Sequence, residues 1–167
     1  FNLIAHSLPT KEVRKNFGKM LFAENKKLKL DVIIPVPETS IPAAIGYSQA
    51  SGVPYEEGLS KNRYIYRTFI EPRQIARDEK VKIKLTVLKS VIRGKRVGVL
   101  DDSIVRGTTS RQIVKMLFEA GAKEVHFLVG SPPVKFPDFY GIDTPSQKEL
   151  IGAQKSIKET EKFLGAT

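Results

Sequence analysis

The sequence predicts an α/β domain with a mostly parallel, twisted sheet and helices on both of its faces. Three short runs, at 31–36, 96–100 and 124–129, have the length and apolar composition of strands. Segments with a helical spacing of apolar residues follow the first two runs, at 41–51 and 108–120. Because strands that alternate with helices favour parallel crossovers, one sheet covered on both faces is the expected arrangement.

The first half of the chain begins with a predicted helix that starts at Thr10. Its apolar face is expected to consist of Val13, Phe17, Met20 and Leu21. The segment 31–36 is apolar after its first residue, as expected of a strand that is covered on both faces. The helix at 41–51 tolerates Pro42 in its first turn, and the turn at 52–55 leads into a short strand.

The second half returns to regular structure with a turn at 93–95 and the strand 96–100. In the helix predicted from 108 to 120, four residues are expected to point inward: Ile113, Val114, Leu117 and Phe118. Gly121 is expected to end this helix as a C-cap.

The C-terminal part of the chain follows the strand at 124–129. Ser146 and Glu149 have the spacing of a capping box, which predicts the start of a last helix that runs toward Leu164.

The composition describes one soluble domain. A chain of 167 residues can form one full core but is too short for two typical domains. No apolar run approaches the roughly 20 residues of a membrane span, and the first six residues lack the features of a signal peptide. The absence of cysteine excludes disulfides, iron–sulfur clusters and a cysteine nucleophile within these residues, and a cytoplasmic setting is expected. Because residue 1 is Phe, we expect the chain to be an excerpt or a processed product.

The net charge of +10 is concentrated in one segment, from Lys61 to Arg96, which has 12 Lys and Arg residues against three acidic ones. Within it, residues 61–84 have no clean periodicity and contain Pro72, which predicts a long, functional loop. Such a basic segment is consistent with either a nucleic-acid-binding surface or a lid that closes over a small polyanion.

The candidate chemistry lies where the strand 96–100 ends. Ligands of parallel sheets bind at the carboxyl ends of strands, and here the strand is followed directly by Asp101 and Asp102. Two adjacent carboxylates repel each other and lose hydration at such a position. Sugar hydroxyls and a hard divalent cation would compensate them.

A second feature follows a few residues later. The sequence Gly107-Thr108-Thr109 combines a tight turn, two hydroxyl groups and the free amides of a helix N-terminus, which together favour phosphate binding. Carboxylates that bind sugar hydroxyls, next to a turn that binds phosphate, indicate a pentose 5-phosphate as the ligand. A helix cap with a surface carboxylate would explain any single one of these residues, but it does not explain the whole run from 101 to 109.

The run from Val99 to Thr109 resembles the phosphoribosyl pyrophosphate (PRPP) binding motif of type I phosphoribosyltransferases, in the form found in glutamine PRPP amidotransferases. Three further blocks resemble the same family in the same order: 34–40, 61–70 and 136–143. The resemblance extends from about residue 13 to 151 and leaves residues 1–10 unmatched. It implies one type I phosphoribosyltransferase domain over 1–167 in which 61–84 is a flexible catalytic loop.

The resemblance also implies an activity and its residues. Ammonia would displace pyrophosphate from PRPP and give 5-phosphoribosylamine, the first step of de novo purine biosynthesis. Asp101 and Asp102 would hold the ribose hydroxyls and, together with Ser40, Mg²⁺. The remaining implied PRPP-binding residues are Glu38 and Thr39 at the pyrophosphate, and Ser103, Arg106, Gly107, Thr108 and Thr109 at the 5-phosphate.

In this scheme Lys61 would neutralise the departing pyrophosphate. The loop residues that the resemblance assigns to this region are Asn62, Arg63, Tyr64 and Arg67. The chemistry supports a lid independently, because an oxocarbenium-like ribosyl centre would react with water unless water is excluded. His126 lies within an apolar strand and His6 in the unmatched segment, so neither is assigned a role.

The family's glutaminase domain, with its N-terminal cysteine, has no counterpart in these residues. The expected partner is therefore a glutaminase domain or subunit that supplies ammonia. The resemblance further implies a homo-oligomer and purine nucleotide inhibitors, without nucleic acid or membrane partners. Three alternatives stay open: a salvage phosphoribosyltransferase that acts on a nucleobase, a non-catalytic PRPP-binding regulatory protein, and a basic nucleic-acid binder.

Overall fold

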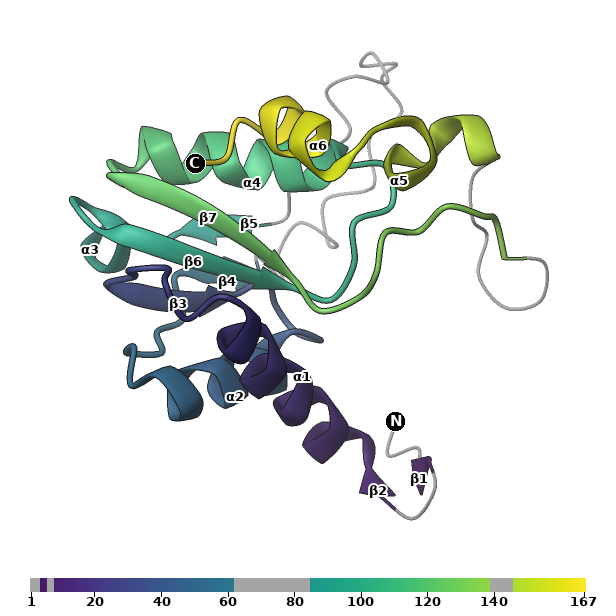
Figure 1. Ribbon diagram of the computed structural model, residues 1–167. Helices are drawn as coiled ribbons and strands as arrows, with labels where there is room; N and C mark the ends of the chain where they lie inside the picture. The colour runs from purple at the N-terminus through teal and green to yellow at the C-terminus, as the bar shows by residue number, and fades with distance from the viewer. Residues whose placement is uncertain (1–3, 6–7, 62–84, 139–145) are drawn as a thin grey trace, which may run out of the picture.

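The computed structural model describes residues 4–5, 8–61, 85–138 and 146–167. Its centre is a parallel sheet of β3 (Val32–Pro35), β6 (Arg96–Asp101) and β7 (Glu124–Val129), with β6 between the other two. These strands confirm the three apolar runs. Helices cover both faces of the sheet, so β3 and the middle of β6 are buried, whereas β7 is buried at Val125 and Leu128 (Figure 1).

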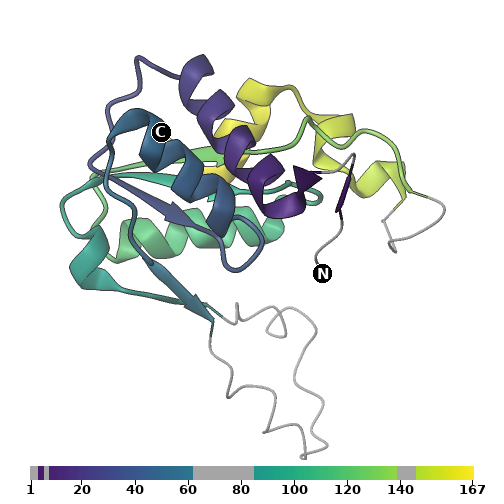
Figure 2. The ribbon, with the colours of Figure 1, turned by 90° about the horizontal axis from the view of Figure 1, so that it is seen from below.

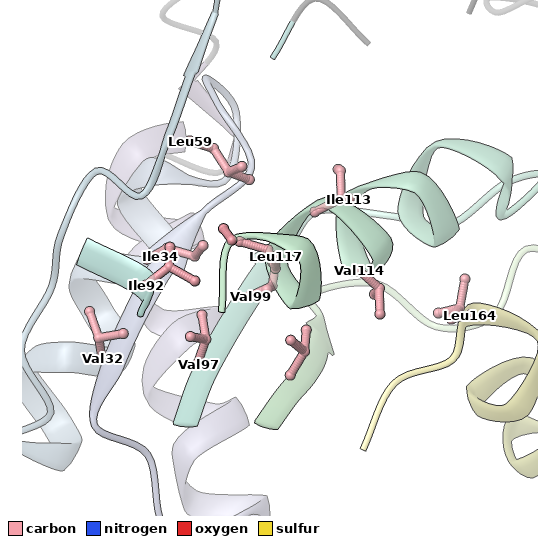
Figure 3. Packing of buried hydrophobic residues seen from close by; sticks show 12 residues of the cluster. Val32, Ile34, Leu59, Ile92, Val97, Val99, Ile113, Val114, Leu117 and Leu164 are labelled. Atoms are coloured by element: carbon pink, nitrogen blue, oxygen red, sulfur yellow. The ribbon is translucent and has the colours of Figure 1, made fainter. Parts of the chain in front are cut away.

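Two helix pairs cover the sheet. On one face lie α1 (Thr10–Glu24) and α2 (Ile41–Ser51), and on the other lie α4 (Thr108–Glu119) and α6 (Ile157–Leu164), as Figure 1 shows. Neighbouring residues of one strand enter different cores, so Ile33 packs with Ala44 and Tyr47 while Val32 and Ile34 pack on the α4 side. The α4-side core is drawn in Figure 3 and consists of Val32, Ile34, Leu59, Ile92, Val97, Val99, Ile113, Val114, Leu117, Ala120, Val125 and Leu164.

A two-stranded antiparallel pair, β4 (Leu59–Lys61) and β5 (Leu85–Val87), lies beside the main sheet. Lys61 is in register with Leu85, so the pair joins the two described ends of the long basic segment. The predicted loop itself, 62–84, lies outside the described residues. The short strand expected after 52–55 is β4, and Tyr55 itself forms a single parallel bridge with Ile33.

The remaining elements are short. A two-stranded antiparallel pair of β1 (Ile4–Ala5) and β2 (Leu8–Pro9) precedes α1, and α3 (Lys89–Ile92) precedes β6. Near the C-terminus lie the 3-10 helix η3 (Gln147–Glu149) and α5 (Ile151–Gln154). Among the described residues, none of the helices combines the length and the apolar character that a membrane span needs.

The predicted capping box at Ser146 and Glu149 is wrong. The Ser146 side chain makes no capping hydrogen bond, and the element that directly follows it is the short 3-10 helix η3 rather than an α-helix. The same sequence spacing recurs at Ser156 and Glu159, where both reciprocal bonds form and α6 begins. Glu149 instead forms an ion pair with a residue distant in sequence, Arg106.

The predicted apolar faces of α1 and α4 are partly wrong. Phe17 and Met20 are 44% and 58% exposed, and Phe118 is 38% exposed. Ile113, Val114 and Leu117 are buried as predicted. On α1, the reason is that Gly18, and not the large apolar side chains of Phe17 and Met20, lies at the contact with α2.

The contact between α1 and α2 depends on two glycines, one on each helix, and Figure 2 shows the two helices side by side in front of the sheet. A Cβ on Gly18 would collide with the carbonyl oxygen of Ala43, and a Cβ on Gly46 with that of Lys15. The backbones therefore approach more closely than any other residue would allow.

We predict that Gly46→Ala lowers the free energy of unfolding by about 2–3 kcal/mol, because the added methyl group has no space. Urea unfolding measures this change. Helix propensity alone would give the opposite sign, a gain of up to about 1 kcal/mol. Ala50→Gly, at an exposed position of α2, is the control and should cost no more than about 1 kcal/mol. Equal or greater stability of Gly46→Ala would contradict the close approach.

Candidate functional site

The predicted site lies where β3 and β6 end. The main-chain N–H of Val36, directly after β3, donates to the carbonyl oxygen of Leu100 at 2.9 Å, which aligns the two strand ends. The buried Ser40, the N-cap of α2, donates its hydroxyl to Asp101 Oδ1 at 3.3 Å. Residues 61 positions apart in the sequence therefore meet at one carboxylate.

The Asp101 carboxylate is electrostatically unfavourable in its ionised form. Burial raises the pKa of Asp101 from 3.8 to about 6, the main-chain N–H of Asp102 opposes this rise, and the charge of Asp102 adds to it. The Asp102 N–H donates to Asp101 Oδ1 at 2.8 Å, and the Ser40 hydroxyl also lowers the pKa. These two donors do not compensate the burial, so a cation or further hydroxyl donors would stabilise the site.

The first turn of α4 forms the second part of the site. Gly107, its N-cap, has a φ of 75°, in the left-handed region that glycine prefers. A Cβ there would also lie only 2.8 Å from Cδ1 of Ile151. The following residues, Thr108 and Thr109, have exposed side chains at the positive end of the helix dipole. This arrangement suits an anion such as a phosphate group.

A third part surrounds the segment before α2. Lys61 Nζ lies 3.9 Å from Glu38 Oε1, and both side chains are about half exposed. Arg14 of α1 donates from Nη1 to the carbonyl oxygen of Thr39 at 3.3 Å. The peptide bond between Pro37 and Glu38 is cis. A cavity of about 360 Å³ adjoins this segment and is lined by Pro35, Pro37, Glu38, Ile41, Glu57, Leu59, Ser60 and Lys61.

Sequence reasoning missed Arg14 and Glu57 because neither belongs to a local motif; only the fold brings them to this edge. Of the predicted 5-phosphate residues, Ser103 is half-buried in the turn after β6. Arg106 is exposed and directs its Nε to Glu149 Oε2 at 2.9 Å. The predicted loop residues lie outside the described part of the chain: Asn62, Arg63, Tyr64 and Arg67.

The donor set at the strand ends fits a magnesium ion that is shared with a substrate. Within the described residues, no three His, Asp or Glu side chains gather closely enough to form a metal cage. Mg²⁺, however, is commonly held by one or two carboxylates, waters and substrate phosphates. Asp101, Asp102 and the Ser40 hydroxyl supply donors of this kind. His126 pairs with Glu124 at 3.0 Å, whereas His6 lies outside the described residues.

A parallel sheet covered on both faces, with adjacent carboxylates and a glycine-led helix N-terminus at the end of its central strand, defines a type I phosphoribosyltransferase fold. A scan against protein-family models gave no match. Two solved structures match closely over 96% of this chain at 52% identity. One is described as the allosteric regulatory enzyme of purine biosynthesis, with a TM-score of 0.83. The other is glutamine PRPP amidotransferase from Bacillus subtilis complexed with ADP and GMP, with a TM-score of 0.82.

Curated sequences agree with these structures. The chain is 55% identical over 153 residues to the amidophosphoribosyltransferase of Bacillus subtilis and 50% identical over 153 residues to that of Methanothermobacter thermautotrophicus. Each alignment covers 92% of this chain and 32% of the relative. Over nine-tenths of its length, the chain is thus similar to one part of the amidophosphoribosyltransferases, and it spans about a third of the length of the curated relatives it matches.

The raised pKa of Asp101 predicts a pH-dependent effect of Asp101→Asn on stability. A carboxyl group whose pKa is raised on folding favours the folded state most below its unfolded pKa of 3.8, and this contribution is lost as the pH rises through about 6. Asparagine cannot ionise. Without ligand or Mg²⁺, the variant should therefore match the native chain near pH 4 and exceed its stability by about 1–2 kcal/mol near pH 8.

Urea unfolding at a series of pH values measures this difference. Asp102→Asn is the matched control, since Asp102 is exposed and its substitution should give a smaller gain. A stability difference for Asp101→Asn that does not change between pH 4 and pH 8 would contradict the assigned electrostatics.

Proposed function

We propose that this domain binds PRPP with Mg²⁺ and transfers its phosphoribosyl group to ammonia, which releases pyrophosphate and forms 5-phosphoribosylamine. It would thus be a glycosyltransferase of purine biosynthesis. The observation that carries the proposal is the convergence of Ser40, Asp101 and Asp102 at one strand end, beside the N-terminus of α4. The similarity of the chain to amidophosphoribosyltransferases supports it.

Asp101 and Asp102 would hold the substrate's ribose. Their carboxylates accept hydrogen bonds from the 2- and 3-hydroxyls, and these donors stabilise the ionised form of Asp101 that burial disfavours. Ser40, Asp101 and Asp102 would also hold Mg²⁺, directly or through water. When bound, Mg²⁺ neutralises charge on the leaving pyrophosphate.

The 5-phosphate would bind at the first turn of α4. The free main-chain amides at this turn and the hydroxyls of Thr108 and Thr109 donate to its oxygens. Ser103 and Arg106 complete this part of the site from the preceding turn. Since the 5-phosphate does not react, its binding fixes the ribose and orients the anomeric carbon.

The pyrophosphate would lie along Glu38, Thr39 and Ser40, ahead of α2. Lys61 approaches this segment at its 3.9 Å contact with Glu38, where its ammonium group would stabilise the charge that grows on the leaving group. The loop residues beyond Lys61 would cover the reacting centre and exclude water. They include Asn62, Arg63, Tyr64 and Arg67.

The partners proposed here follow from the family. A glutaminase domain or subunit would supply ammonia, and the chain would act as a homo-oligomer in the cytoplasm. Purine nucleotides would inhibit it. The Bacillus subtilis relative, whose structure is described as a complex with ADP and GMP, supports this last proposal.

The direct test incubates the chain with PRPP and Mg²⁺ and measures pyrophosphate release. Ammonium should start release, faster at higher pH because neutral ammonia is the nucleophile, whereas glutamine alone should not, since no cysteine is present to form a thioester. Release that strictly requires a nucleobase would favour a salvage enzyme. Binding of PRPP without release under any condition would favour a regulatory protein. If an oligonucleotide, but not a PRPP analogue with Mg²⁺, slows trypsin cleavage within residues 61–84, a nucleic-acid binder would be favoured.

Asp101→Asn and Asp102→Asn should each lower ammonia-dependent turnover by at least about a hundredfold, because each removes charged hydrogen bonds to the substrate. Initial rates of pyrophosphate release at varied PRPP concentration give the change. Asp31→Asn, at the opposite end of the sheet, should leave turnover within about twofold. Near-normal rates in both site variants would exclude the assignment of these carboxylates.

Lys61→Gln should lower kcat by about ten- to a hundredfold while the KM for PRPP changes less, because the ammonium group acts on charge that grows as pyrophosphate departs. The matched control is Lys89→Gln on α3, a lysine of the same basic segment, and it should change neither constant by more than about twofold. An equal loss in both variants would indicate a general effect of positive charge rather than a role of Lys61.

A further inference from the structure

We propose that Glu149 is a positioning residue that orients Arg106 toward the 5-phosphate of the substrate. This inference rests on the proposed function. It begins with the hydrogen bond and ion pair from Arg106 Nε to Glu149 Oε2, at 2.9 Å. Arg106 directly precedes Gly107, the N-cap of α4, so its guanidinium group originates beside the proposed phosphate site.

The segment that carries Glu149 is fixed against the turn before α4. The main-chain N–H of Ile151 donates to the carbonyl oxygen of Val105 at 2.9 Å. The Ile151 side chain packs so closely on Gly107 that a Cβ would lie 2.8 Å from its Cδ1. Leu150, which lies between Glu149 and Ile151 in the sequence, is fully buried. Glu149 therefore projects from a rigid support, and its carboxylate can define the direction of the arginine side chain.

The geometry of the pair leaves donors for a ligand. Among the described residues, Arg106 forms its hydrogen bond through Nε alone, so the N–H groups of its two terminal nitrogens remain able to bind a phosphate oxygen. The pair of Arg96 and Asp31 differs, because both Nε and Nη2 of Arg96 are bound, at 3.1 and 2.7 Å. That bidentate pair joins the amino ends of β3 and β6, far from the site.

A role in stability does not explain the pair of Arg106 and Glu149. Their side chains are 55% and 52% exposed, and ion pairs with this exposure contribute little to folding. Arginine has many rotamers, however, and a side chain that is already oriented loses less entropy when it binds a ligand. The carboxylate thus improves substrate binding without changing the chemical step.

The test compares kinetics and stability in Glu149→Ala and Glu149→Gln. Glu149→Ala should raise the KM for PRPP by about three- to tenfold with kcat within about twofold, and its urea midpoint should not change. Glu149→Gln should lie between Ala and the native chain, since an amide oxygen still accepts from Nε. In an Arg106→Ala background, Glu149→Ala should have no further effect on KM.

Asp31→Ala is the matched control: it should lower the urea midpoint and leave the KM for PRPP unchanged. An unchanged or lower KM in Glu149→Ala, or an equal effect in the Arg106→Ala background, would overturn the inference and leave the proposed function intact. If the native chain releases no pyrophosphate from PRPP, the proposed function fails. Calorimetric binding of ribose 5-phosphate by the same variants then decides the role of Glu149: the Kd should rise in Glu149→Ala, rise less in Glu149→Gln, and not rise further when Glu149→Ala is added to Arg106→Ala.

Discussion

The structure depends on one constraint, the placement of a carboxylate at the buried end of its central strand. β6 has no exposed face, since β3 and β7 flank it and helices cover both sides (Figure 1). Its last residue, Asp101, therefore loses hydration, and its pKa rises to about 6. Hydration is replaced in part by the Ser40 hydroxyl and the Asp102 amide. A site arranged in this way favours a ligand that brings hydroxyl donors and a cation.

The sequence predicted the central fold well because its signals are local. Each strand of the sheet is a short apolar run, and α2 and α4 have clear boundaries at Pro42 and Gly107. The predictions failed where tertiary contacts select among equivalent local patterns. Large apolar residues such as Phe17 suggested one face of α1, but a close glycine contact uses another. The serine–glutamate form of the capping-box spacing occurs at both Ser146 and Ser156, and only Ser156 forms the reciprocal bonds and starts an α-helix.

In the candidate site, too, the features that come from contiguous residues could be predicted from the sequence, and those that depend on packing could not. The run from Asp101 to Thr109 is contiguous, so its chemistry could be inferred from residue types and spacing. The contact of Ser40 with Asp101 spans 61 residues and was expected only through resemblance to a family. The contacts of Arg14 with Thr39 and of Arg106 with Glu149 had no such signal, because each depends on how separate elements pack. Such contacts fix the orientation of groups that the local motif identifies.

The most direct test of the central claim is an NMR titration of the Asp101 side-chain carboxyl carbon, in the free chain and with Mg²⁺ and ribose 5-phosphate. The structure predicts a pKa near 6 in the free chain, and ribose hydroxyls with a cation should lower it clearly. Asp31, whose pKa is held far below its usual range by Arg96, is an internal control that the ligand should not affect. A free-chain pKa near 4, or a titration of Asp101 that ligand and Mg²⁺ leave unchanged, would contradict the account.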